Sequence, residues 1–73
     1  MRSISDLALA AYLASIGHCL HEIRRTNDRG EFIFENTPSL GIQILDFYNR
    51  CAMVDPLTYA ETLRNLKAAA QTA

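Results

Sequence analysis

Two histidines and two cysteines are the side chains of this sequence best suited to metal binding or nucleophilic catalysis. His18, Cys19 and His21 lie close together, whereas Cys51 lies far along the chain. A structural zinc ion takes four nitrogen or sulfur ligands in tetrahedral geometry. The second ligand pair is missing here because Cys51 stands alone. We therefore expect neither a metal site nor a bound cofactor.

The same residues could form a cysteine–histidine pair of the kind that performs covalent catalysis. Such a pair needs an orienting group and an oxyanion hole in addition to the thiolate and the imidazole. The sequence identifies neither, and its three glycines are too far apart for a phosphate-binding loop. We therefore predict no enzymatic activity. The two cysteines are expected to behave as small apolar side chains rather than as a disulfide.

Positive charge gathers at Arg24, Arg25 and Arg29. Such a cluster can grip a phosphate backbone, and a nearby aromatic ring can stack on a base. Three acidic residues are interleaved with these arginines, and the formal net charge of the whole chain is −1. Ion pairs across a solvated hairpin are the simpler role for the arginines. Nucleic-acid binding through them is therefore the alternative hypothesis.

The arginines lie within residues 19–35, which predict a single β-hairpin. Phe32 and Phe34 alternate with other residues, so the second strand presents one aromatic face. The segment 27–30 is rich in residues that tolerate turn conformations. A hairpin alone is marginal in water, so other elements must cover one face.

The register of the hairpin decides which residues join the phenylalanines. If Thr26 pairs with Glu31, then Ile23 faces the core together with Cys19 and His21, and Leu20 lies on the opposite face. A bulge at Gly30 would instead place Arg24 and Glu22 on the core face. The first register is favoured because it buries Ile23 and no charged pair.

Helical patterns occupy the remainder of the chain. The first helix is predicted over residues 5–16, with Ser3 or Ser5 as its cap and Gly17 as a left-handed stop. This helix is apolar nearly all round, so it should be covered on more than one side.

Two further helices are predicted after the hairpin. One begins at Thr37-Pro38 and runs to about residue 50, where Asp46 and Arg50 can pair along the helix. The other is capped by Asp55 and runs from Pro56 to about residue 70, followed by a frayed tail.

Apolar residues make up 49% of the 73 positions. A chain this short has little interior, so some apolar surface should be left for a partner. We expect a homodimer whose interface includes Ala11, Leu20 and Ile33. Two hairpins could join at their edges into a four-stranded sheet, which would hide the exposed edges.

Several stretches of the sequence together resemble a known family. They are DLALAAYLASIGHCLHEI, GEFIFEN, LDFYNRCAMVDP and TYAETLRNLKAA. The chain resembles a family of short bacterial and phage domains of unknown function, and the resemblance extends from Asp6 to Lys67. It implies a bacterial or mobile-element setting and a cytoplasmic location, and it brings no site residues.

The sequence thus predicts a single α+β domain over residues 1–73, in the order α-β-β-α-α, with one antiparallel hairpin packed by three helices. The predicted function is a small non-enzymatic module for protein interaction or regulation, cytoplasmic and homodimeric. No span of the chain is predicted to cross a membrane, because no apolar stretch reaches the roughly 20 residues required.

Overall fold

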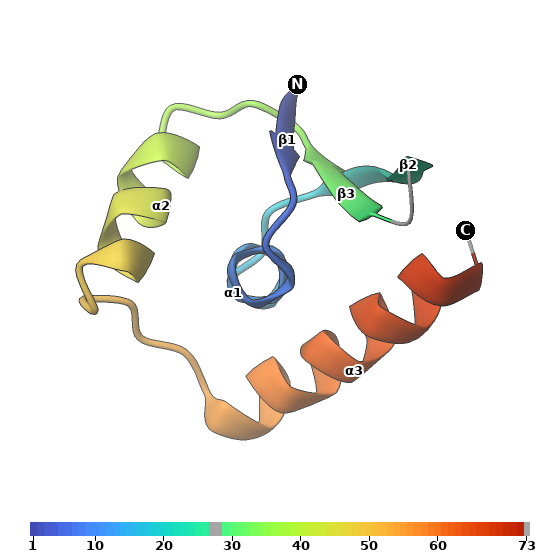
Figure 1. The fold of residues 1–73 in the computed structure, drawn as a ribbon. Helices are drawn as coiled ribbons and strands as arrows, with labels where there is room; N and C mark the ends of the chain where they lie inside the picture. The colour runs from blue at the N-terminus through green and yellow to red at the C-terminus, as the bar shows by residue number, and fades with distance from the viewer. Residues whose placement is uncertain (27–28, 73) are drawn as a thin grey trace.

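The described residues form three antiparallel strands and three helices, with one helix at the centre (Figure 1). The structure is a computed structural model that describes residues 1–26 and 29–72. Its elements are β1 (Arg2–Ile4), α1 (Leu7–Ser15), β2 (Leu20–Thr26), β3 (Arg29–Phe34), α2 (Leu40–Tyr48) and α3 (Pro56–Thr72). The predicted α+β class is confirmed.

The sheet has three strands rather than the predicted two, in the order β1-β3-β2. The N-terminal segment was expected to precede a helix, but it forms β1 and pairs with β3 from Arg2 opposite Phe34 to Ile4 opposite Phe32. Three residues are too few to show an alternating pattern. The strand is held by this pairing and by Ile4, which is 5% exposed and belongs to the core.

The predicted register of the hairpin is wrong. Thr26 pairs with Arg29, and Ile23 lies opposite Phe32. Strand β2 ends at Thr26 and β3 begins at Arg29. The predicted turn included Asn27 and Asp28, which lie outside the described residues.

A β-bulge lies at the start of the hairpin, where Leu20 pairs with Phe34 and Glu22 pairs with Ile33. One extra residue in β2, His21, changes the alternation of faces along the strand. Leu20 therefore packs against the core with Ile23, and the prediction that it lies on the opposite face is wrong. Cys19 and His21, which were placed on the core face, are exposed instead. Because of the bulge, Leu20 and Ile23 lie on the same buried face although they are three positions apart in the sequence.

Helix α1 fills the middle of the fold, as its apolar composition predicted. Five consecutive residues from Leu9 to Leu13 are buried, and the helix contacts the sheet, α2 and α3. Its cap is Asp6 rather than a serine, because the Asp6 carboxylate accepts hydrogen bonds from the backbone N–H groups of Ala8 (2.9 Å) and Leu9 (3.4 Å). The predicted stop at Gly17 is confirmed by its φ of +104°.

Helix α2 is shorter than predicted at both ends. Thr37 accepts a backbone hydrogen bond from Leu40 in the turn that precedes the helix, so Pro38 lies before it. Arg50 has a φ of +61°, which ends the helical conformation. The expected ion pair between Asp46 and Arg50 does not occur among the described residues, because Arg50 lies beyond the helix.

Helix α3 begins as predicted, with Asp55 as its cap and Pro56 as its first residue. Its inner face packs against the core cluster through Tyr59, Leu63, Leu66 and Ala70. The Tyr59 hydroxyl also donates to the backbone oxygen of Ala8 (3.3 Å). The helix continues to Thr72, two residues beyond its predicted end.

The cap of α3 makes the stability of the fold depend on pH. The backbone N–H of Thr58 donates to the Asp55 carboxylate at 2.8 Å and the Thr58 hydroxyl donates at 3.0 Å, and these bonds lower the pKa of Asp55. Because the folded pKa lies below the unfolded value, this stabilisation is present above the unfolded pKa and is lost as the pH falls through the folded pKa.

Asp55→Asn should therefore lower the melting temperature at pH 7 and reduce the loss of stability on acidification. Thermal unfolding followed by circular dichroism between pH 2 and pH 7 measures both effects, because this range extends about two units below and about three units above an ordinary aspartate pKa. Equal pH profiles for the variant and the wild type would contradict the assignment.

Candidate interaction surface

Helix α2 exposes an apolar face that no described part of the chain covers. Ile42, Leu45 and Tyr48 are 62%, 63% and 60% exposed, respectively. Their spacing of three residues places them on one side of the helix. We call these three residues the α2 face. Leu40 and Ile44 are buried against the rest of the chain, so α2 is apolar on two sides.

Aromatic contacts attach the inner side of α2 to α1 and fix the position of Tyr48 on the α2 face. Phe47 stacks on Tyr12 of α1, with ring centroids 5.7 Å apart and an interplanar angle of 29°. Tyr48 meets the edge of Phe47, with centroids 5.5 Å apart and an angle of 80°. Offset and edge-to-face pairs of this kind are favourable. The Tyr48 ring is thus positioned through Phe47.

A side-chain hydrogen bond also fastens α2 to the loop that follows α1. It joins Nε2 of His18 and Oε1 of Gln43. His18, one of the residues considered for metal binding, therefore has a structural partner. Among the described residues, no group of three or more His, Cys, Asp or Glu side chains is arranged to hold a metal ion. Cys19 and Cys51, both in the described part of the chain, are exposed free thiols.

Gly41 lies beside the α2 face in the first turn of the helix. A Cβ atom built on it would meet no atom within 4 Å, and its φ lies outside the left-handed region. Glycine in a helix interior is about 1 kcal/mol less favourable than alanine. The packing of this chain therefore does not explain why the position is glycine.

The predicted interface residues lie elsewhere and differ in their surroundings. Ala11 is fully buried within the core of its own chain, and Leu20 is half-buried against that core. Ile33 is on the opposite face of the sheet, as predicted, but it is only 6% exposed. These positions offer a second chain little apolar surface. The prediction missed the α2 face, although the excess of apolar residues in LGIQILDFY was a usable signal.

The three arginines proposed for nucleic-acid binding do not form one patch. Neighbouring residues of a strand point to opposite faces, so Arg24 and Arg25 diverge. Arg24 forms an ion pair with Glu22 at 3.0 Å, and this hydrogen bond, with the charge of Glu22, raises the pKa of Arg24. The aromatic ring of Phe32 in the neighbouring strand is 2% exposed, so it is not available to stack on a base.

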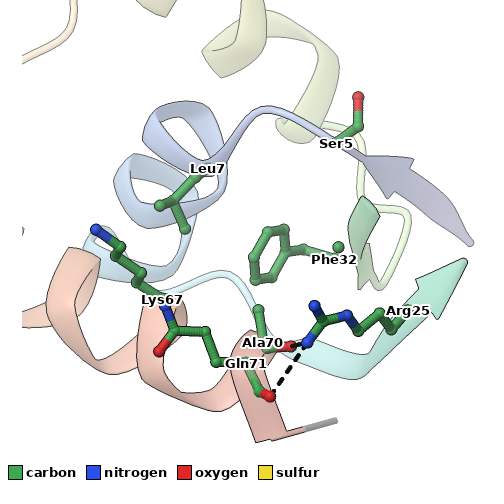
Figure 2. A pocket seen from close by; sticks show the side chains of 8 residues that line it. Ser5, Leu7, Arg25, Phe32, Lys67, Ala70 and Gln71 are labelled. Atoms are coloured by element: carbon green, nitrogen blue, oxygen red, sulfur yellow. Dashed lines mark hydrogen bonds between the residues drawn. The ribbon is translucent and has the colours of Figure 1, made fainter. Parts of the chain in front are cut away.

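Arg25 has a structural role at the end of α3. Its NH1 group donates to the backbone oxygens of Ala70 (3.3 Å) and Gln71 (3.1 Å), as Figure 2 shows. These oxygens belong to the last turn of the helix, which lacks intrahelical donors and carries partial negative charge. A cation from β2 thus satisfies the C-terminus of α3.

The arrangement defines a small α+β domain in which one apolar helix is enclosed by a sheet and two further helices. The chain belongs to the family described as Domain of unknown function (DUF5659), whose family model matches residues 2–72. Comparisons with curated proteins and with solved structures found no match. No helix in the described part of the chain combines the length and apolar character needed to cross a membrane.

Arg25→Gln should destabilise the fold by about 1 kcal/mol, because two hydrogen bonds from a charged donor are lost. For a domain of this size the melting temperature should fall by roughly 4–8 °C. Arg24→Gln is the matched control, since it removes an equal charge from the neighbouring position and only an exposed ion pair. Equal melting temperatures for the two variants would contradict the structural role of Arg25.

Proposed function

We propose that this domain is a non-enzymatic protein-interaction module that forms a homodimer through the α2 face. The observation that carries the proposal is the exposure of Ile42, Leu45 and Tyr48 side by side on one short helix. Small soluble proteins rarely leave contiguous large apolar side chains in water without a binding partner. Covering them gains roughly 25 cal/mol for each Å² of apolar surface removed from water.

The energetics of α2 support association as well. A helix of nine residues is too short to be stable in water by its own hydrogen bonds. Packing against α1 stabilises its inner side through Leu40, Ile44 and Phe47. A second surface against its outer side would stabilise it further, so that binding and ordering of α2 reinforce each other.

A second copy of this chain is the occupant that best fits the α2 face. A two-fold axis brings the same surface of two subunits together, so an apolar stripe meets an apolar stripe. Gly41 supports a close approach of two helices, since no atom of its own chain occupies the space beside it.

Charge complementarity points to the same occupant. Asp46 follows Ile42 by one turn of the helix, and Arg50 lies just beyond its end. Within the described part of the chain, neither forms an ion pair. When two copies of α2 pack parallel to each other about the two-fold axis, Asp46 of one subunit and Arg50 of the partner subunit lie toward the same end of the interface. The proposal thus replaces the hairpin edge with the α2 face as the dimer surface.

Leu45→Glu should convert the dimer into a folded monomer, because it places a charge in the centre of the α2 face. Native mass spectrometry should give twice the 8.2 kDa chain mass for the wild type and a single chain mass for the variant. Leu57→Glu is the matched control, since Leu57 is 80% exposed but lies on α3. The control variant should remain dimeric.

A monomeric wild type, or a Leu45→Glu variant that stays dimeric, would overturn the proposed dimer. A wild-type mass that includes a bound oligonucleotide would instead favour nucleic-acid binding. Circular dichroism of Leu45→Glu separates loss of the dimer from loss of the fold.

Gly41→Ala should have opposite effects on the fold and on the dimer. In the Leu45→Glu background, alanine should raise the stability of the monomer by less than the roughly 1 kcal/mol that separates the two residues in a helix interior, because Gly41 lies in the first turn. In the wild-type background, the added methyl group should weaken the dimer by holding the two helices apart. Thermal unfolding measures the first effect and sedimentation against concentration measures the second. An unchanged dissociation constant would show that the helices do not meet at Gly41.

A further inference from the structure

A second feature of the molecule is a cavity of about 210 Å³ lined by residues of α1, β2, β3 and α3. It opens between the sheet and the last turns of α3 (Figure 2). Apolar atoms form its interior, from Leu7, Phe32 and Ala70. Neither the packing of the core nor the proposed dimer uses this cavity.

The cavity is preserved by a glycine in β3. A Cβ on Gly30 would lie 3.5 Å from the Cβ of Ala70 and 3.9 Å from the ring of Phe32, which is ordinary contact distance. A residue larger than glycine would therefore fit, but its side chain would fill the space between β3 and α3. Gly30 leaves that space open to a ligand.

The described side chains around the cavity carry charges of one sign. Among the residues that the structure describes, Arg25 and Lys67 are the charged ones that line it, and they lie toward opposite ends of it (Figure 2). Two full positive charges outweigh the partial negative charge at the end of α3, part of which Arg25 already satisfies. The cavity thus favours an anion.

The arrangement of the hydrogen-bond donors of Arg25 indicates which class of anion fits the cavity. Its NH1 group is committed to the oxygens of Ala70 and Gln71. Its Nε and NH2 groups make no hydrogen bond to any residue that the structure describes, and together they form the planar pair that binds a carboxylate through both oxygens. The hydrogen bonds at NH1 hold the guanidinium at the edge of the cavity.

We propose that this cavity binds an organic carboxylate that carries a compact apolar group. The carboxylate lies on the Nε–NH2 edge of Arg25, and the apolar group lies against Phe32 and Leu7. Lys67 is exposed on a flexible stem and adds its charge at the mouth. Such a carboxylate is found in a free acid and in the C-terminal residue of a peptide.

The volume supports a ligand with one small ring or a short branched chain. An apolar cavity of about 150 Å³ holds a benzene molecule. The present cavity is somewhat larger and is open at the side of the charges, so benzoate is a suitable probe. Acetate lacks the apolar group, and benzyl alcohol lacks the charge.

Titration of the ¹⁵N-labelled protein tests the proposal. Benzoate should shift the amide signals of Gly30, Phe32 and Ala70 in a saturable way, and it should bind at least tenfold more tightly than acetate or benzyl alcohol. Lys67→Gln should weaken benzoate binding several-fold, whereas Arg64→Gln, an equal charge change on the same exposed helix, should not. Gly30→Ala should also weaken binding, because its methyl group enters the cavity.

Two peptides of the same sequence, both ending in phenylalanine, distinguish the two sources of the carboxylate. One peptide has a free C-terminal carboxylate, and the other has a C-terminal amide. Tighter binding of the free carboxylate form than of benzoate identifies a peptide C-terminus as the ligand, and weaker binding identifies a free acid. A carboxylate peptide that binds more tightly than benzoate but no more tightly than its C-terminal amide would overturn the proposal, as would equal effects of Lys67→Gln and Arg64→Gln. Substitution of Arg25 is not decisive, because it also removes the hydrogen bonds at the end of α3.

Discussion

The burial of α1 is the constraint on which the rest of this structure depends. A helix with Leu9 to Leu13 all buried has no side that can face water, so it must be covered around its circumference. The sheet, α2 and α3 lie around α1 (Figure 1), and each contributes apolar side chains to the core cluster that contains the buried residues of α1. Among the described residues, none covers the outer side of α2, where Ile42, Leu45 and Tyr48 are exposed.

Local signals made much of the fold predictable from the sequence. The Asp55-Pro56 start of α3 and the Gly17 stop of α1 depend on the chemistry of a few neighbouring residues, and both are confirmed. The α3 face that includes Leu63 and Leu66 follows from helical spacing. These features needed no knowledge of what lies across the fold.

The features that could not be predicted depend on contacts between distant segments. Strand β1 exists because β3 offers an edge and the core accepts Ile4, and neither condition is visible in three residues. The hairpin register depends on the length of the turn and on a bulge that brings Leu20 and Ile23 to one face. The interface residues Leu20 and Ile33 were chosen from the alternation of faces, so the error in register carried over to Leu20.

The helices on the two sides of α1 differ in how extensively they are attached to the rest of the fold. On one side, α3 is attached along its length, from Tyr59 near its start to the hydrogen bonds of Arg25 at its end, so the cavity beside it has a firm wall. On the other side, α2 is short and is attached chiefly to α1, through the stack of Phe47 on Tyr12 and the bond between His18 and Gln43. Segments with few attachments open at the lowest cost in free energy. A partner that binds only the ordered form of α2 stabilises that form by mass action, so association and the local stability of α2 are linked. The cavity beside α3, in contrast, is already formed in the single chain.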